Sequence, residues 1–534
     1  MYVKGQFFAI LNLSISFISA ILLCVLVILI FSACSPLTSI NHSVKTNYTP
    51  DYNNFTGPIA EPYQEELKQQ KDGALIIDDG RSALLHRLGF VKMATKSIDI
   101  QTYIYKNELT SRLLARELYE AANRGVKIRI LVDDNGISSN FYDLMMLDNH
   151  KNIEVRIFNP YFFRLGVLHA LEAIFDFSRI NKRMHNKLFI FDDTALIVGG
   201  RNIGNEYFEN ANINFTDTDL LFIGNIAKDA KLNFETFWNY KRSIPINLFP
   251  SERKIRKYLK RANNTKEQAK LFDIKKEDWE EYLQDIATFK AKYKNKEFKM
   301  AWGDGIFLAD SPDKVDRNKP ITTPILDALS YNLNQAKQSI IIASSYLVPG
   351  VATMNIWRDF IKKRGIKIKI LTNSLASVDV VPVYSHWENY RDKLALMGAE
   401  VYEYPNLESK KVRLKDKVKF YHSSKGKVSL HSKYMIIDSK LIAIGSFNLD
   451  YRSAMLNTEN IVFFKSKELA EQLKDITESQ MKDSYKIVCD DKTKKCHWIM
   501  HDENGIKQFF VSPNTSIWLR FYKTLAKVIP ENLL

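Results

Sequence analysis

The sequence predicts an α/β fold of two pseudo-symmetric lobes, each a mixed sheet flanked by helices, with the active site at the seam between them. The first observation is a pattern, His-x-Lys-x4-Asp followed by Gly and Asn, that occurs twice with identical offsets, 246 residues apart. The second is that segments upstream of this pattern repeat at nearly the same separation. The motif residues are His185, Lys187, Asp192, Gly199 and Asn202, then His431, Lys433, Asp438, Gly445 and Asn448.

Three upstream segments have counterparts later in the chain. The pairs are 97–103 with 339–345, 124–131 with 364–371, and 154–155 with 400–401. Between the first two segments, apolar residues recur at helical spacing and Arg124-Gly125 follows, which is typical of a helix that ends there. A strand, a helix and a second strand predict a right-handed crossover onto a mixed sheet. The apolar positions of this helix are Leu113, Leu114, Leu118 and Ala121.

Each motif runs into a short apolar segment, 188–191 in the first copy and 434–437 in the second. Such a run, bounded by polar residues, is typical of a buried strand. Because side chains at i and i+2 share one face of a strand, we expect the His and Lys of each motif to point the same way. The motif Asp then falls where the strand ends.

We expect five segments along the chain. They are a signal peptide, lipoprotein signal peptide or membrane anchor (1–34), a linker (35–72), a first lobe (73–240), a charged helical insertion (241–300) and a second lobe (301–534). The insertion is dense in Lys and Glu with scattered apolar residues such as Trp279 and Tyr282. We interpret it as an exposed helical segment without chemistry, because a charge run is usually a solvated face.

The N-terminal segment predicts a membrane tether. No Asp, Glu, Lys or Arg occurs between Lys4 and Lys45, and residues 7–31 are almost entirely apolar. A run of this length can span a bilayer or serve as an export signal. The sequence Phe-Ser-Ala-Cys that ends at Cys34 resembles a bacterial lipobox, so Cys34 is the expected lipidation site. Either outcome anchors the protein to the bacterial cell membrane, with its body expected on the periplasmic or outer side.

Cys489 and Cys496 are the only cysteines within the predicted lobes. The residues between them are typical of a turn, so the two thiols can face each other across a hairpin. Exported proteins keep such disulfides and cytosolic proteins rarely do, so we favour a disulfide over free thiols on the basis of the compartment.

The motif residues suit cleavage of a phosphodiester. Two Lys and two Asn that converge on the phosphate oxygens would offset the negative charge and stabilise the transition state. One His can attack phosphorus while the other protonates the leaving oxygen and later deprotonates the acceptor. Each His needs an orienting carboxylate, and the candidates follow the His of their own copy by 32, 34 and 28 residues. These carboxylates are Asp217, Asp219 and Glu459, and we expect neither a metal nor a cofactor.

These residues carry a resemblance to the phospholipase D superfamily. The sequence resembles most closely its bacterial cardiolipin synthase branch, and within it the cardiolipin synthase C type. The resemblance covers roughly residues 73–534. The segments 176–187 and 199–204 are similar to the first half of the family pattern, and 371–376, 445–448 and 457–459 are similar to the second half.

The resemblance implies a role for each motif residue. His185 would be the nucleophile and His431 the general acid and base, while Lys187, Lys433, Asn202, Asn448 and Ser446 would bind phosphate. The resemblance further implies that Asp192, Asp438, Gly199 and Gly445 have structural roles. Gly200 stands where many members of the superfamily have Ser, so a hydroxyl contact is expected only from Ser446 in the second copy.

The substrate class is less sharply defined. The net charge of +15 suits anionic phospholipid headgroups and nucleic acid equally. The apolar segment 158–175 would fit acyl chains or a buried core helix, and the C-terminal stripe would lie on a membrane or pack on the body. This stripe consists of Ile517, Phe521, Leu525 and Val528.

The leading hypothesis is a membrane-associated phosphatidyltransferase that makes cardiolipin through a phosphohistidine intermediate. Its partners would be phospholipids (phosphatidylglycerol, phosphatidylethanolamine or cardiolipin) and the membrane surface, with no obligatory nucleic acid. The alternatives are a phospholipase D hydrolase that releases phosphatidic acid, a nuclease of the same superfamily, and a non-catalytic lipid-binding protein. Both halves of the site and a membrane tether in one chain argue against the nuclease, and intact paired motifs argue against a non-catalytic protein.

Overall fold

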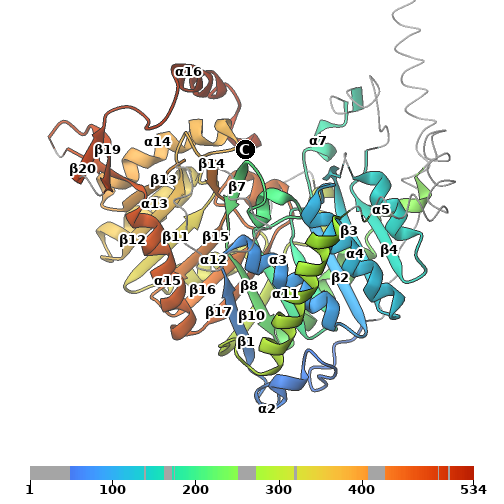
Figure 1. Ribbon diagram of the computed structural model, residues 1–534. Helices are drawn as coiled ribbons and strands as arrows, with labels where there is room; N and C mark the ends of the chain where they lie inside the picture. Colours follow the sequence, from blue (N-terminus) through green and yellow to red (C-terminus); the bar gives the residue numbers. More distant parts are fainter. Residues whose placement is uncertain are drawn as a thin grey trace, which may run out of the picture.

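The computed structural model describes residues 48–137, 140–161, 171–172, 175–249, 272, 274–317, 322–406, 427–490, 492–502 and 505–534. The predicted signal or anchor with Cys34, and most of the apolar segment 158–175, therefore lie outside the described residues. Figure 1 shows the first lobe, in blue and green, beside the second lobe, in yellow and red.

The strands form an 18-stranded mixed sheet and a separate two-stranded sheet. The first lobe contributes β1 (Asp72–Ile77), β2 (Ser97–Ile104), β3 (Lys127–Gly136), β4 (Ile153–Phe158), β5 (Leu188–Phe191), β6 (Ala195–Gly199), β8 (Asp219–Ile223) and β9 (Ser243–Pro245). The second contributes β10 (Ala301–Ala309), β11 (Ser339–Ser344), β12 (Lys367–Asn373), β13 (Glu400–Tyr404), β15 (Lys433–Ile437), β16 (Leu441–Gly445), β17 (Asn460–Lys465), β18 (Tyr485–Cys489), β19 (Cys496–Asp502) and β20 (Gly505–Phe509). The small sheet pairs β7 (Ile213–Thr216) with β14 (Lys427–Leu430).

The two lobes have matching strand orders. The first runs β9-β4-β3-β2-β5-β6-β8-β1, and the second continues as β10-β17-β16-β15-β11-β12-β13-β18-β19-β20. In each lobe three parallel strands, β2-β3-β4 or β11-β12-β13, are followed inward by antiparallel pairs. A pseudo-two-fold axis therefore passes between β1 and β10, which confirms the predicted fold of two repeated α/β lobes.

Helices cover both sheet faces in both lobes (Figure 1). The α-helices are α2 (Gln64–Leu67), α3 (Gly80–Met93), α4 (Leu109–Asn123), α5 (Phe141–Asp148), α7 (Phe177–Ile180), α8 (Asn225–Trp238), α11 (Lys276–Lys294), α12 (Pro324–Asn334), α13 (Gly350–Lys362), α14 (Val381–Met397), α15 (Lys467–Lys482) and α16 (Ile517–Ala526). Short 3-10 turns occupy Glu61–Tyr63, Asn205–Phe208, Ile246–Leu248, Pro312–Asp316 and Glu531–Leu533, and a π-helical turn occupies Arg452–Leu456.

The apolar side chains form three layers. One lies between the first sheet and α3, α4, α5 and α11, and another lies between the second sheet and α12, α13 and α14. The central layer joins the remaining faces of both sheets with α8 and α15. Because strands of both lobes contribute to this central core, the two lobes are held together by apolar burial along their whole contact.

The predicted exposed insertion is instead part of the first lobe. β9 pairs with β4 at the edge of the sheet, and α11 packs on α3. The apolar residues of α11 recur at helical spacing and are buried in the core of the first lobe: Trp279, Tyr282, Ile286, Phe289 and Tyr293. A Cβ atom at Gly89 would lie 2.2 Å from the Phe289 ring, so the close approach of α11 requires glycine there. Because the segment carries many charged residues, its apolar face was not recognised in the sequence.

The described part of the predicted linker is also packed. Phe55, Ile59, Tyr63 and Leu67 are buried in the core of the first lobe. Tyr293 Oη donates a hydrogen bond to the Ile59 carbonyl over 2.7 Å. The segment from residue 55 onward is therefore part of the lobe.

The motif aspartates tie neighbouring strands together. Asp192, after β5, accepts hydrogen bonds from the amides of residues 95–97, which lead into β2. Asp438, after β15, accepts from the amides of residues 337–339 at 2.8–2.9 Å, which lead into β11. Both aspartates have positive φ, 50° and 52°. This contact orients the strand start beside each motif and agrees with the structural role that the resemblance implies.

We predict that Asp438→Ala lowers the free energy of unfolding by about 1–3 kcal/mol, because three amide donors lose a charged acceptor. Although burial raises the pKa of Asp438, the three amide donors bring it below the ordinary value of Asp. Its contribution should therefore be present above about pH 4 and be lost as the pH falls through the lowered pKa. Urea unfolding of both proteins at several pH values measures this. Unchanged stability with lost activity would contradict a structural role.

Candidate active site

Both histidines lie at the seam, held by main-chain bonds between the lobes. β7 of the first lobe pairs with β14 of the second, and the His431 amide that follows β14 donates to the Thr216 carbonyl over 2.7 Å. The same arrangement recurs with the lobes exchanged, because the His185 amide donates to the Thr458 carbonyl over 2.9 Å. Each histidine is thus fixed beside the segment that precedes a carboxylate of the opposite lobe.

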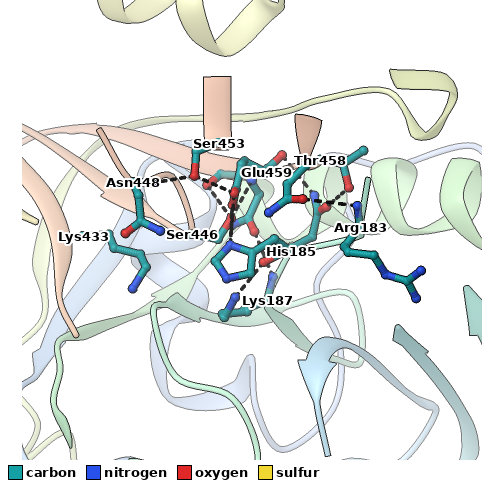
Figure 2. A network of polar contacts seen from close by, with 12 residues as sticks. Arg183, His185, Lys187, Lys433, Ser446, Asn448, Ser453, Thr458 and Glu459 are labelled. Atoms are coloured by element: carbon teal, nitrogen blue, oxygen red, sulfur yellow. Dashed lines mark hydrogen bonds and ion pairs between the residues drawn. The ribbon is translucent and has the colours of Figure 1, made fainter. Parts of the chain in front are cut away.

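His185 is oriented by Glu459 (Figure 2). Its Nδ1 lies 2.9 and 3.0 Å from the two carboxylate oxygens. The carboxylate keeps the proton on Nδ1, which leaves Nε2 with its lone pair for reaction. Glu459 also accepts hydrogen bonds from the hydroxyls of Ser446 and Ser453, so its position is determined from both sides.

His431 is oriented by Asp217, with 2.7 Å between Nδ1 and Oδ2. Asp217 also accepts from the Thr218 amide over 2.8 Å. Glu459 and Asp217 thus orient histidines, as predicted, but each carboxylate crosses the seam to the histidine of the other lobe rather than the one in its own copy. The reason lies in the backbone pairing, because Thr216, next to Asp217, is bonded to His431 and Thr458, next to Glu459, is bonded to His185. The two half-sites are therefore each incomplete without the other lobe.

Asp219 does not orient a histidine, contrary to the sequence prediction. It is completely buried, accepts a hydrogen bond from the Arg87 guanidinium over 2.9 Å and forms an ion pair with Arg201 at 3.3 Å. It begins β8, two residues after Asp217, and its side chain is directed to the buried arginines of the first lobe. Its role is to neutralise two buried arginines, one of which, Arg201, also donates to the Asp217 carbonyl.

Ser446 was predicted to bind phosphate, but its hydroxyl is used by the protein. It donates to Glu459 and accepts from the Asn460 amide at 3.0 Å. Gly200 is its counterpart in the first lobe, and a Cβ atom there would lie 2.5 Å from Asp217 Oδ2. The absence of a side chain at Gly200 is therefore what allows the shorter Asp217 to reach its histidine. Glu459 is thus held by the Ser446 hydroxyl, whereas Asp217 occupies the space beside Gly200. Each arrangement positions the carboxylate that orients a histidine.

The two motif lysines are buried beside their histidines. Lys187 Nζ donates to the His185 carbonyl over 2.7 Å, and Lys433 Nζ donates to the His431 carbonyl over 2.6 Å. Lys433 also donates to Ser345 Oγ, and its Nζ lies 3.3 Å from each ring nitrogen of His431. Figure 2 shows both ammonium groups near the His185 ring, where they can meet one anion.

The motif asparagines lie in the same layer. Asn202 accepts from the Ile104 amide at 3.1 Å, and Asn448 accepts from Ser345 Oγ at 3.0 Å. In both cases the protein binds the amide oxygen, so the side-chain NH2 remains as the donor to offer a phosphate oxygen. Gly199 and Gly445 are close to the adjacent strand: a Cβ atom would meet Asp219 or the Asn460 carbonyl at 2.1 Å. They therefore have the structural role that the resemblance implies.

Sequence reasoning missed three supporting residues. Ser345 links Lys433 to Asn448, Ser453 binds Glu459, and Asp310 accepts from the Glu459 amide over 3.0 Å. Ser345 ends the segment 339–345, and that repeat was the available signal for it. Asp310 and Ser453 lie outside the repeated segments, so only the tertiary structure brings them to the site.

Burial favours the neutral forms of the two histidines and the two lysines of the site. Burial, together with the nearby Lys187 and Lys433, lowers the pKa of His185 to about 4 despite the opposing charge of Glu459. Burial also lowers the pKa of Lys187 to about 7, and it lowers the pKa values of His431 and Lys433. The His185 imidazole is therefore neutral near pH 7, as a nucleophile requires. An incoming phosphodiester anion would favour the charged form of each lysine and of His431.

The walls of the two half-sites differ. The His185 ring meets the edge of Tyr103, with 5.3 Å between ring centroids. The His431 ring is bounded by Tyr207 and Phe215, at 5.3 and 4.9 Å. Within the described residues no group of three metal-ligating side chains is placed to hold a metal ion.

We predict that Gly200→Ser slows the reaction, because its side chain would displace Asp217 from His431. The expected loss is about 10- to 100-fold in kcat, as for other groups that orient a reacting residue. Ser446→Gly is the matched change in the other lobe and should loosen Glu459 instead. Steady-state kinetics of both variants measure this, with circular dichroism as a control for folding. A wild-type rate for Gly200→Ser would contradict the proposed need for Asp217 to orient His431.

We predict a pH dependence from Lys187. Because its lowered pKa is about 7, the ammonium charge is present below this pH and is lost as the pH rises through it. The kcat/KM for an anionic phosphodiester should therefore fall above about pH 7, and Lys187→Arg should move this fall to higher pH because Arg stays charged. A pH–rate profile of both proteins tests this. An alkaline limb that does not move would assign it to another group.

Comparison with known proteins agrees with this geometry. The family model described as cardiolipin synthase, PLD-like domain, matches residues 88–238 and 329–481, one match in each lobe. The chain is 32% identical to cardiolipin synthase C of Escherichia coli over 86% of this chain and 95% of that protein. It is 43% identical to an uncharacterized protein of Helicobacter pylori over 90% of this chain and 93% of that protein.

A solved structure shows the same fold. The phosphatidylserine synthase of Haemophilus influenzae superimposes with a TM-score of 0.54 at 12% identity, covering 89% of this chain and all of that one. Two segments of the chain match the family model, and the similarity to cardiolipin synthase C covers 86% of this chain. The two half-sites meet at the seam between the matched segments. The protein belongs to the cardiolipin synthase family of phospholipase D-like enzymes.

Proposed function

We propose that this protein is a membrane-associated phosphatidyltransferase that forms cardiolipin through a phosphohistidine intermediate. The observation that supports this most strongly is the doubled unit at the seam, in which two histidines are held by crossed carboxylates beside two buried lysines. One neutral imidazole and a second imidazole on the other side of one phosphate are what a two-step transfer needs.

In the first step, Nε2 of His185 attacks phosphorus and the bond to the headgroup oxygen breaks. His431, protonated when the anion is bound, gives its Nε2 proton to the departing oxygen, which leaves as an alcohol. The phosphatidyl group is now bound to His185. In the second step, neutral His431 takes the proton from the hydroxyl of an acceptor lipid, whose oxygen attacks phosphorus. The bond to His185 breaks, so both histidines return to their starting forms.

The charges of the site support this sequence. Lys187 and Lys433, with the NH2 groups of Asn202 and Asn448, face the phosphate from both lobes and offset the charge that develops on its oxygens. Glu459 stabilises the imidazolium character of His185 while its bond to phosphorus exists. Although burial raises the pKa of Glu459, His185 and Lys187 bring it below its ordinary value, so this carboxylate stays ionised.

The membrane association rests on residues 1–47, which lie outside the described residues. We propose that they anchor the body to the bacterial cell membrane, with Cys34 as the lipidation site and the body on the periplasmic or outer side. Within the described part of the chain, none of the helices combines the length and apolar character needed to cross a bilayer. Cys489 and Cys496 form a disulfide, which suits an exported protein.

A lipid assay tests the proposal. With vesicles of phosphatidylglycerol and phosphatidylethanolamine, the full-length protein should release a headgroup alcohol and form cardiolipin. Phosphatidic acid as the main product would assign hydrolysis, and turnover of neither lipid would contradict both activities. A single-stranded oligonucleotide as a parallel substrate tests for nuclease activity.

We predict that two histidine variants separate the two steps. His185→Asn should lose at least 10³-fold of activity on every substrate, because no nucleophile remains. His431→Asn should lose activity on natural lipids but keep a burst of about one p-nitrophenol per site from phosphatidyl-p-nitrophenol, because that leaving group needs no proton whereas the second step still needs the base. His150→Ala, remote from the site, is the control. Equal losses for both variants with the activated substrate would contradict these assignments.

A further inference from the structure

The helix α16 presents its apolar face away from the body. Its outward residues are exposed, with Trp518 at 76% and Val528, just after the helix, at 84%. The whole outward set follows helical spacing: Ile517, Trp518, Phe521, Tyr522, Leu525 and Val528. The sequence predicts two alternative positions for the stripe of Ile517, Phe521, Leu525 and Val528, on a membrane or packed on the body. The structure places it on the outside.

The opposite face of α16 attaches to the body through polar contacts. Lys523 Nζ binds Glu388 of α14 over 2.6 Å, and Lys527 binds the same carboxylate. Ala526 is the buried residue of the helix, and Leu519 is partly buried. A surface helix of a soluble protein normally buries its apolar stripe and exposes its lysines. The reverse arrangement leaves a contiguous apolar face that requires a cover.

Two further exposed apolar residues lie in the segment between β20 and α16. Phe510 and Val511, which follow β20, are 75% and 60% exposed. This hairpin is firmly held, because Trp498 of β19 donates to buried Glu403 over 2.7 Å and Cys489–Cys496 links β18 to β19. Figure 1 shows β19 and β20 at the left edge of the second lobe and α16 at its top, joined by the chain that follows β20. The apolar residues therefore lie on a rigid support.

The segment after α16 leads directly to the active site. The Ile529 carbonyl lies 2.8 Å from Nε2 of His386, and Tyr390 Oη donates to Glu531 at 2.7 Å. Arg452 then binds the carbonyls of Leu533 and Leu534, and its guanidinium also reaches Asn181, four residues before His185. The next residue, Ser453, supports Glu459 at 2.9 Å. The segment that follows α16 thus reaches Arg452, which is next to a residue that supports Glu459.

We propose that the outer face of α16 with Phe510 and Val511, here called the docking face, inserts into the interface of a phospholipid bilayer. The proposal rests on the proposed function, since a lipid substrate must leave a bilayer to reach the site. Three aromatic side chains in this face, Trp518, Phe521 and Tyr522, are the type that settles at headgroup depth. Exposed Lys492, Lys494 and Lys495 on the adjacent turn suit anionic headgroups.

The docking face would lie about 5–10 Å deep, as amphipathic interfacial helices do. Docking at this depth would present the seam to lipid headgroups, and acyl chains could remain in the bilayer during transfer. A second copy of the chain is the other possible cover, but it would place the site mouth against protein. The bilayer is therefore the occupant that agrees with the site.

The test uses the full-length protein reconstituted in phosphatidylglycerol–phosphatidylethanolamine vesicles. Tryptophan fluorescence is measured with and without lipids brominated on the acyl chains near the headgroup. Wild type should be quenched, and Trp518→Phe should lose most of this quenching. Because quenching does not depend on turnover, it reports docking even if the lipid assay finds no transfer. Equal quenching in both proteins would overturn the proposal, and so would its absence in wild type.

A kinetic test separates docking from catalysis. Phe521→Ser with Leu525→Ser should lower the rate on vesicles at least 10-fold but leave the rate on a monomeric short-chain phosphatidylglycerol within twofold. The matched control is Ile306→Ser with Tyr331→Ser, two exposed apolar residues outside the docking face. An equal loss on both substrates would overturn the proposal. A dimer in sedimentation that these α16 substitutions dissociate would assign the face to a second copy instead.

Discussion

The bond between each imidazole and a carboxylate of the opposite lobe is the contact on which the site depends. His185 needs Glu459 and His431 needs Asp217, so neither lobe can present a correctly oriented histidine alone. The main-chain bonds to Thr458 and Thr216 fix the same crossing in the backbone. The central apolar core and the β1–β10 pair hold the lobes at the required distance. The association of the two lobes therefore also sets the geometry of the active site.

The pseudo-symmetry is incomplete in ways that suit two different roles. Glu459 is held by two serine hydroxyls and stays ionised beside His185, whereas burial raises the pKa of Asp217 beside His431. The first histidine is thus paired with a charged partner, which suits the covalent intermediate that we propose for it. The second is paired with a shorter carboxylate in a space that Gly200 leaves open.

The exposed apolar face of α16 is also connected to the active site. The proposed docking face lies on a helix whose C-terminal continuation is bonded to Arg452, which precedes a residue that supports Glu459. Lys523 and Lys527 keep that helix oriented through Glu388, so its apolar residues cannot turn inward without loss of two ion pairs. A short segment held by hydrogen bonds therefore connects the proposed docking face to the active site.

The sequence by itself determined the two-lobe fold, the location of the site at the seam and the motif residues, because a repeat at fixed offsets reports geometry that two copies share. It also identified Asp217 and Glu459 as carboxylates near the site. Only the tertiary structure decided which histidine each one serves, since crossing the pseudo-dyad is a long-range contact without a local pattern. The same holds for Asp219, whose two arginine partners are distant in sequence, and for Ser446, whose hydroxyl binds Glu459. It holds for α11 and α16, where helical spacing defines an apolar face but packing alone decides whether that face is covered.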